Sequence, residues 1–202
     1  MAARPAIRSF QEQYAQIRKL PEGVTGEIIE PGKLSTMSRP GRTHRFTANA
    51  IRRSLAGFDR YQGGAGWWFE VEAEIRFGER LLVPDIAGWR VREDDKFLDD
   101  NPIRVAPDWA CEVLSGTTTR KDRMLKLPIY VRSGVSWVWL VDTEAQLVEV
   151  YEPAGGHPAQ IVAAGEADRV RLPPFDSIEI DLAQWWLSKP PAPTEPSPEP
   201  SM

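Results

Sequence analysis

Alternating hydrophobic and polar positions along the chain predict mainly β-strands. The clearest case is the segment 67–77, in which every second residue is apolar and the residues between them are mostly charged. Because side chains along a strand point to opposite faces in turn, this segment predicts one long strand with a buried and a solvated face. We interpret its row of acids, Glu70, Glu72 and Glu74, as part of the solvated face.

Shorter patterns predict the remaining elements. Apolar runs bounded by turn residues predict strands at 24–30, 34–38, 81–89, 109–114, 136–141 and 146–152. Helical periodicity predicts helices over 42–58, 118–132 and 181–187, after a first helix that begins at Ser9. Ser9 and Glu12 have the spacing of a capping box, and Pro21 ends this first helix. Pro128 lies inside the segment 118–132 and should kink or shorten that helix.

The order of these elements indicates the fold class. A helix, a hairpin, a helix, three strands, a helix and further strands favour an α/β fold with α+β character over repeated βαβ units. The acidic segment 93–100 is expected to be a loop, and 153–180 is expected to hold short strands and loops. Residues 188–202 contain six prolines and almost nothing apolar, which predicts a disordered tail after one domain at 1–187.

Composition narrows the function classes. A chain of 202 residues is long enough for one domain with its own core. Its one cysteine excludes an internal disulfide and a thiolate zinc cluster, and its two histidines exclude a histidine-rich metal site. The N-terminus lacks the apolar core of a signal peptide, and no stretch approaches the ~18–20 apolar residues that span a bilayer. We therefore expect a cytoplasmic protein without membrane contact.

Positive charge is concentrated in two segments although the net charge is −4. Residues 39–60 contain six arginines against Asp59, and residues 120–132 contain five lysines and arginines against Asp122. Two basic helices on an acidic protein would suit a polyanion such as nucleic acid. Ordinary solvated helix faces would have the same composition, so both interpretations stay open.

Two acidic residues lie inside apolar strands. Asp85 follows Pro84 in one predicted strand, and Glu112 lies within the strand 109–114. An ionised carboxylate is costly to bury without a partner, so each acid needs a cation, a hydrogen-bond network or a proton. If the two strands are neighbours, the carboxylates lie side by side, and a divalent cation with oxygen ligands would relieve their repulsion. Alternatively, they are unrelated acids that face water at strand ends.

These acids are also part of a recognisable sequence pattern. Pro84-Asp85 followed by Glu112-Val113-Leu114 resembles the PD-(D/E)XK nuclease motif. An ordered set of segments, which spans roughly residues 20–187, resembles a large family of bacterial restriction-endonuclease-like proteins in that superfamily. The segments are 26–30, His44 at the start of the second helix, 82–87, 107–115, 122–134 and 139–142.

The resemblance implies a fold and a set of catalytic residues. The fold would be restriction-endonuclease-like, with a central mixed β-sheet flanked by helices. Asp85 and Glu112 would bind Mg²⁺, or Mn²⁺ in its place, with the Val113 carbonyl as a further ligand. The motif normally has a lysine two residues after the second acid, where this chain has Leu114. In the family the lysine has moved to the following helix, which points to Lys126. There it would hold the attacking water or the developing oxyanion.

Glu27 would be an accessory acid in this scheme, although a strand acid that faces solvent is the other interpretation. The resemblance implies a metal-dependent endonuclease that hydrolyses phosphodiester bonds of DNA. Five basic side chains from the two basic helices are the candidates for contacting the nucleic acid: Arg42, His44, Arg45, Arg120 and Arg123. For His44, packing at the end of the helix is the other interpretation, and the favoured one. The alternative is a catalytically degenerate nuclease-fold protein that binds nucleic acid or a protein partner without cleavage, which Leu114 favours.

The oligomeric state follows only from indirect arguments. Cleavage of both strands of a duplex often needs two sites, so we expect a homodimer. The chain has eight tryptophans, which is many for its length. They predict a large aromatic core or a stacking surface, and the excess could also line a dimer interface.

Overall fold

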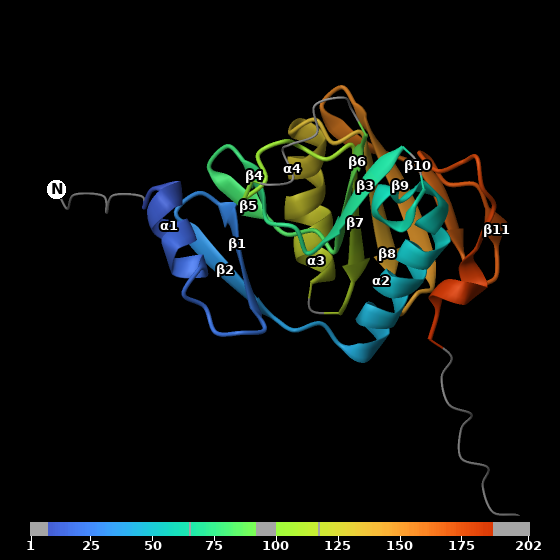
Figure 1. Ribbon diagram of the computed structural model, residues 1–202, viewed down its shortest axis with the longest axis horizontal. Helices are drawn as coiled ribbons and strands as arrows, with labels where there is room; N and C mark the ends of the chain where they lie inside the picture. The colour runs from blue at the N-terminus through green and yellow to red at the C-terminus, as the bar shows by residue number, and fades with distance from the viewer. Residues whose placement is uncertain (1–7, 65, 92–99, 117, 188–202) are drawn as a thin grey trace, which may run out of the picture.

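The computed structural model describes residues 8–64, 66–91, 100–116 and 118–187 (Figure 1). The helices are α1 (Phe10–Ile17), α2 (Arg42–Ser54), α3 (Thr119–Lys121), the π-helical turn η4 (Asp122–Lys126), α4 (Leu127–Arg132) and the 3₁₀ turns η1 (Ala56–Phe58), η2 (Arg60–Gln62) and η5 (Leu182–Trp185). The strands are β1 (Val24–Glu30), β2 (Lys33–Ser38), β3 (Trp67–Val71), β4 (Ile75–Phe77), β5 (Arg80–Leu82), β6 (Ile86–Arg90), β7 (Trp109–Leu114), β8 (Trp137–Asp142), β9 (Leu147–Ala154), β10 (His157–Gly165), β11 (Arg169–Val170) and β12 (Ile180–Asp181).

A six-stranded mixed sheet forms the centre of the molecule. Its strand order is β10-β9-β8-β7-β6-β3, and β7 and β8 are parallel while the other neighbours are antiparallel. Two parallel neighbours need a crossover connection, which α3, η4 and α4 provide. Every residue of β7 is buried, which explains why its sequence is apolar apart from Glu112.

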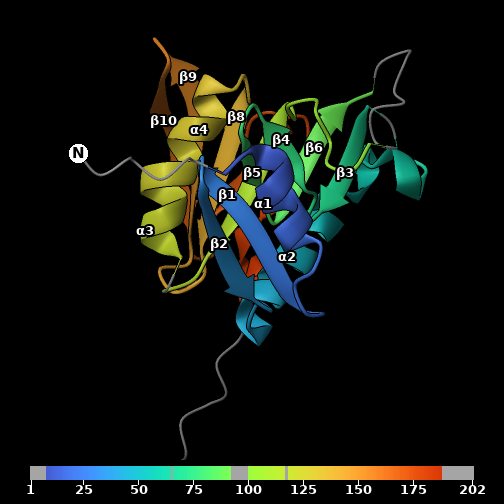
Figure 2. The same cartoon turned by 90° about the vertical axis from the view of Figure 1, so that its left-hand side faces the viewer.

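Helices cover both faces of this sheet (Figure 1). Helix α2 packs its apolar side on one face, where Ala50, Ile51 and Leu55 join the core cluster around Trp109. Helix α4 packs on the opposite face, where Tyr130 and its neighbours join a second cluster. The hairpin β1–β2 belongs to a smaller sheet of order β2-β1-β5-β4, and it lies with α1 in front of the main sheet in the turned view (Figure 2).

Aromatic rings fill the core on the α2 face. The Phe175 ring lies 4.9 Å from Trp67, 5.2 Å from Trp109 and 5.6 Å from Trp139, measured between ring centroids. Buried tryptophans stand at 67, 89, 109, 139, 185 and 186. Six of the eight tryptophans therefore belong to the core, which favours the core interpretation of their abundance over a stacking surface.

The segment 67–77 is not the single long strand that its alternation predicts. The chain leaves the main sheet after β3, passes through Glu72 with φ 52°, and enters the smaller sheet as β4. Consequently the acidic row does not form one solvated face, since the Glu74 carboxylate accepts a 2.6 Å hydrogen bond from the Tyr14 hydroxyl. Alternation reports which side chains share a face, and it does not report whether the strand is continuous.

A similar break divides the segment 81–89. Strand β5 ends before Pro84, which has no N–H for a sheet, and β6 begins after Asp85 in the other sheet. Further along, 153–180 holds a nine-residue strand, β10, paired along β9, where only short strands were expected. The predicted closing helix is the 3₁₀ turn η5, and the helix over 42–58 ends at Ser54 before a 3₁₀ turn.

The helix over 118–132 is divided in the way that Pro128 suggests. It consists of α3, the π-helical turn η4 and α4, and Pro128 lies in the first turn of α4. A proline has no N–H to donate to the carbonyl four residues earlier. Wider π-helical turns occur where this series of helical hydrogen bonds is interrupted. Most of the predicted loop 93–100 and the whole segment 188–202 lie outside the described residues.

Among the described residues, no helix has both the length and the apolar character needed to cross a membrane.

The two basic helices contribute differently to the surface. Arg42 and Arg45 on α2 are exposed, whereas Arg123 on η4 is partly buried in an ion pair with Glu149.

Replacing Phe175 should show how much the aromatic core contributes. Phe175 is fully buried, so Phe175→Ala leaves a cavity among the surrounding rings and should lower the free energy of unfolding by about 3–5 kcal/mol. Urea denaturation followed by tryptophan fluorescence measures this loss. Ile161→Ala is the control, because Ile161 is 43% exposed and should change stability by less than about 1 kcal/mol. Equal losses for the two variants would contradict this description of the core.

Candidate active site

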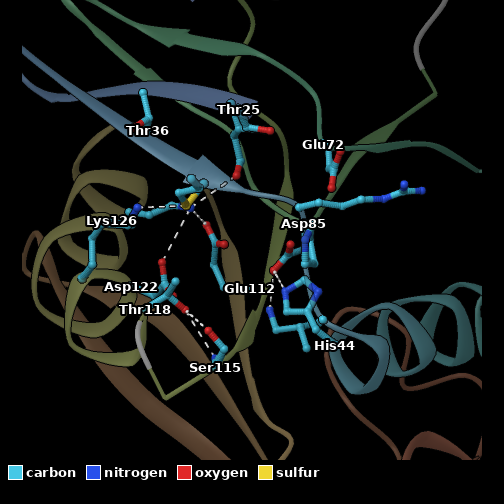
Figure 3. A pocket seen from close by; sticks show the side chains of 17 residues that line it. Thr25, Thr36, His44, Glu72, Asp85, Glu112, Ser115, Thr118, Asp122 and Lys126 are labelled. Carbon is cyan, nitrogen blue, oxygen red and sulfur yellow. Dashed lines mark hydrogen bonds and ion pairs between the residues drawn. The ribbon is translucent and has the colours of Figure 1, made fainter. Parts of the chain in front are cut away.

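A pocket of about 490 Å³ opens where the two sheets meet (Figure 3). Hairpin β1–β2 and the start of α2 form two of its walls, and the C-terminal end of β7 with the following helical segment forms the others. Asp85, Glu112 and Lys126, which are remote in sequence, all line this pocket together with Val113 and His44. The structure therefore brings together the residues that the family resemblance singled out, and their catalytic roles stay predictions.

Strand pairing explains why the two acids converge. Strands β6 and β7 are antiparallel with Ile86 opposite Cys111, so Asp85 and Glu112 are the next residues in the same register. Side chains at opposed positions of paired strands point to the same face of the sheet. The backbone N–H of Val113 also donates a 2.7 Å hydrogen bond to Asp85 Oδ2, which fixes the aspartate beside β7.

Each of these acids keeps one oxygen without a hydrogen bond in the described part of the chain. Asp85 Oδ2 contacts the Val113 N–H and, at 3.1 Å, His44 Nε2, while Oδ1 has no such partner. Glu112 Oε1 accepts a 2.5 Å hydrogen bond from the Tyr130 hydroxyl and lies 2.7 Å from Lys126 Nζ, while Oε2 has no such partner. The site therefore offers two carboxylate oxygens that are not yet engaged.

Lys126 is the buried counter-charge of the site. Its side chain is 1% exposed, and its Nζ lies 2.7 Å from Glu112 Oε1, 3.0 Å from Glu27 Oε1 and 3.3 Å from the Val83 carbonyl oxygen. Burial by itself lowers the pKa of Lys126, but the surrounding carboxylates outweigh burial and raise that pKa above its ordinary value. Lys126 is therefore an ammonium group whose three N–H donors all have acceptors within the protein.

Glu27 is a second buried charged residue at the site. It is completely buried, so the solvent-facing interpretation of this acid is wrong. Its Oε1 accepts a hydrogen bond from the Val83 N–H in addition to the contact with Lys126, and its Oε2 lies 3.0 Å from Lys121 Nζ. Burial raises the pKa of Glu27, but Lys126 and Lys121 outweigh burial and lower that pKa overall. Glu27 is thus a buried carboxylate that joins two lysines.

Negative charge exceeds positive charge around Lys126. Asp122 Oδ1 lies 3.7 Å from the ammonium group, so Asp122 is a third carboxylate beside it. Burial raises the pKa of Glu112 and of Asp122, and neighbouring carboxylates contribute in the same direction. Burial is the larger cause of both shifts, and a divalent cation bound to the carboxylate oxygens would offset it and the repulsion between the acids.

His44 contacts an acid of the site. Burial lowers the pKa of His44, but the hydrogen bond and the charge of Asp85 outweigh burial, so that the pKa is raised. Its other ring nitrogen, Nδ1, is buried without a hydrogen-bond partner among the described residues. In this structure His44 therefore holds Asp85, and contact with nucleic acid stays a prediction.

The predicted nucleic-acid-binding arginines are scattered over several surfaces. Arg45 lines a neighbouring hollow of about 900 Å³ that shares His44 and Asp85 with the pocket. Arg120 lies on another groove beside β2, which shares Lys121 with the pocket. Arg42 is exposed at the start of α2, and Arg123 is paired with Glu149 on β9. Arg39, which was not among the candidates, lines both the pocket and its neighbouring hollow.

The donor set of the pocket suits a hard divalent ion. Mg²⁺ prefers oxygen ligands and is often held by one or two carboxylates with water completing its shell. Asp85 and Glu112 each have an unengaged carboxylate oxygen beside the backbone of Val113, which agrees with this preference. Within the described ranges, no group of three or more histidine, cysteine, aspartate or glutamate side chains is arranged to hold a metal. The ligands from the protein would therefore be few.

The roles of three residues at the site could not be assigned from the sequence: Lys121 and Asp122, which line the pocket, and Tyr130, which is buried behind it. Tyr130 donates to Glu112, Asp122 adds a third carboxylate, and Lys121 reaches Glu27 from α3. The sequence places Lys121 only in a basic segment, Asp122 in that segment and in the family resemblance, and Tyr130 only in the family resemblance. The available signal was the spacing of four residues from Asp122 to Lys126 and again from Lys126 to Tyr130, because residues four apart share a helix face.

Comparison with known proteins agrees with this architecture. A solved structure described as a putative nuclease belonging to DUF820, from Anabaena variabilis, is similar to this chain with a TM-score of 0.67. The match has 23% sequence identity and covers 89% of this chain and 97% of the other. Together with the mixed sheet flanked by helices, this likeness confirms the predicted restriction-endonuclease-like fold.

The family follows from the sequence match. The family Uma2, described as "Putative restriction endonuclease", matches residues 11–183. The chain therefore belongs to this family, as its motifs predicted, and the membership supports a nuclease function. No curated protein matches the chain.

Removing the ammonium group should destabilise the protein strongly. Lys126→Met leaves Glu27, Glu112 and Asp122 buried without their shared cation, and the free energy of unfolding at neutral pH should fall by about 3–5 kcal/mol. The unpaired carboxylates of the folded variant would have raised pKa values, so the loss should shrink as the pH falls and they bind protons. Urea denaturation over a pH series measures both effects.

The matched control is Lys19→Met, because Lys19 is exposed and lies outside the pocket. This substitution should change the free energy of unfolding by no more than about 0.5 kcal/mol. A Lys126→Met protein as stable as the control at neutral pH would show that the buried carboxylates do not depend on Lys126.

Proposed function

We propose that this protein is a metal-dependent endonuclease that hydrolyses phosphodiester bonds of DNA, with Mg²⁺ as its cofactor and Mn²⁺ as a substitute. The observation that carries the proposal is the convergence of Asp85 and Glu112 at one pocket, each with an unengaged carboxylate oxygen. Membership of a family of nucleases supports the same reaction class.

In this proposal the protein prepares the metal site through its own hydrogen bonds. Asp85 and Glu112 would hold the ion, with the Val113 carbonyl as a further ligand. Tyr130 and Lys126 both engage Glu112 Oε1, so Oε2 would be available to hold the ion. His44 and the Val113 N–H both engage Asp85 Oδ2, so Oδ1 would be available in the same way. When bound, the ion would act as a Lewis acid, which polarises a phosphate and lowers the pKa of a water molecule.

The surroundings of the pocket suit an anionic polymer. Arg39 lines the pocket itself, and Arg45 lines the adjoining hollow. Cations beside a metal site attract phosphate groups on either side of the bond to be cut. DNA is the substrate that we propose, and Arg42, Arg120 and Arg123 remain candidates for contacts outside the pocket. We also propose that cleavage of duplex DNA uses a homodimer, which brings two such pockets to the two strands.

One observation favours a second candidate function. Leu114 occupies the position of the motif lysine and is buried, and all three N–H donors of Lys126 already have acceptors in the protein. A site without a free lysine suits a protein that binds nucleic acid or a protein partner without cleavage. The expectation that Lys126 holds the attacking water therefore stays a prediction.

Substitution of both acids tests the proposed reaction. Asp85→Asn with Glu112→Gln keeps the shape of the side chains but removes the charges that hold the ion. Cleavage of a fluorescently labelled DNA duplex in Mg²⁺ should fall by roughly a hundredfold or more. Titration calorimetry with Mn²⁺ should show an uptake by the wild type that the double variant lacks, while far-ultraviolet circular dichroism stays unchanged.

The matched control is Asp176→Asn with Glu179→Gln, because both acids are exposed and neither lines the pocket. This control should cleave DNA and bind Mn²⁺ as the wild type does. Cleavage by the Asp85 and Glu112 double variant at the wild-type rate would refute the site. Mn²⁺ uptake without cleavage of any nucleic acid by the wild type would favour the second candidate.

A further inference from the structure

Two lysines engage Glu27, and they differ in access to the pocket. Lys126 contacts Glu27 Oε1 with a side chain that is 1% exposed, whereas Lys121 contacts Glu27 Oε2 with a side chain that is 20% exposed. Both residues line the pocket that contains Asp85 and Glu112. A group must be reachable from the pocket to contact a substrate, and Lys121 meets this condition better than Lys126.

The hydrogen-bond donors of the two lysines lead to the same distinction. An ammonium group has three N–H donors and no acceptor. Lys126 directs its donors to two carboxylates and to the Val83 carbonyl oxygen, at distances of 2.7–3.3 Å. A phosphate oxygen could reach Lys126 only by displacing one of these strong acceptors in a closed environment, where a lost carboxylate contact is costly.

Lys121 is engaged far less completely. Its Nζ has one carboxylate acceptor, Glu27 Oε2 at 3.0 Å, and one thioether acceptor, Met37 Sδ at 2.9 Å. A thioether sulfur is a weak acceptor, so a phosphate oxygen can replace it at little cost. The third N–H of Lys121 has no acceptor in the part of the chain that the structure describes. Lys121 can therefore donate to an anion while Glu27 still holds it.

The buried carboxylate gives Lys121 a fixed position. Glu27 is completely buried in β1, and the Val83 N–H and Lys126 both hold its Oε1. The remaining oxygen, Oε2, then holds the Lys121 ammonium group against the wall of the pocket. A charged donor that is already oriented costs little entropy when it contacts a substrate.

We propose that Lys121 is the lysine that contacts the substrate phosphate, and that Lys126 is a positioning residue which holds Glu27 and Glu112. Lys121 takes the part of the lysine that is absent at position 114, and its N–H groups stabilise the negative charge that develops on the phosphate oxygens. This inference rests on the proposed function of the same pocket.

The test compares Lys121→Met, Lys121→Arg, Lys126→Met and the exposed control Lys19→Met in the full chain. Two readouts concern the phosphate: kcat for cleavage of labelled single-stranded and duplex DNA in Mg²⁺, and the affinity for thymidine 3′,5′-bisphosphate by calorimetry. The bisphosphate contains no phosphodiester bond, so it reports phosphate contact without cleavage. The third readout is the midpoint of thermal unfolding, which reports a structural role.

Lys121→Met should lower the bisphosphate affinity roughly 10- to 100-fold and kcat roughly 100-fold or more. Its thermal midpoint should fall less than that of Lys126→Met, because Lys126 still neutralises the buried Glu27. Lys121→Arg should recover most of the bisphosphate affinity, because the positive charge returns. Lys126→Met should instead lower the thermal midpoint by roughly 10 °C, because it leaves buried carboxylates unpaired.

The outcomes separate this inference from the proposed function. If the wild type cleaves DNA and Lys121→Met behaves as Lys19→Met does in kcat and in bisphosphate affinity, the inference is overturned while the proposed function stands. If the wild type cleaves no DNA but loses bisphosphate affinity in Lys121→Met and recovers it in Lys121→Arg, the phosphate contact stands without the nuclease. A wild type that binds no bisphosphate overturns the inference.

Discussion

The contact between the buried Lys126 ammonium and the acids around it is the interaction on which the rest of the site depends. Glu27 from the hairpin, Glu112 from the central strand and Asp122 from the following helical turn all lie within 4 Å of its Nζ. None of these carboxylates could stay ionised in its buried position without a nearby cation. One ammonium group therefore joins three elements that are distant in the sequence, and it sets which oxygen of Glu112 remains unengaged.

Breaks in regular structure place the site between the two sheets. The chain leaves the main sheet at Glu72 and returns to it after Pro84, so Asp85 lies at the start of a strand beside β7. The π-helical turn η4 precedes Pro128 and carries Asp122 and Lys126 to the same pocket. Interruptions of this kind are common at functional sites, where a local departure from regular geometry aims a side chain.

Much of this arrangement could be predicted from the sequence, for identifiable reasons. Asp85 and Glu112 stand out because a charge inside an apolar strand needs a partner, and Lys126 was reached through the family resemblance. The break at Glu72 could not be predicted, because a glutamate with positive φ has no local signal and the alternation continues through it. The burial of Lys126 against the carboxylates and the partial exposure of Lys121 depend on how the helical segment is rotated against the hairpin. Residue spacing along the chain does not determine this rotation.

The central claim is that Asp85 and Glu112 together bind one hard divalent ion. Its most direct test is a crystal soaked in Mn²⁺ and measured near the manganese absorption edge, because the anomalous signal locates the ion independently of the protein atoms. We expect one strong peak about 2.0–2.3 Å from a carboxylate oxygen of each of these two residues. A strong peak elsewhere, with none between Asp85 and Glu112 in well-ordered density, would contradict it.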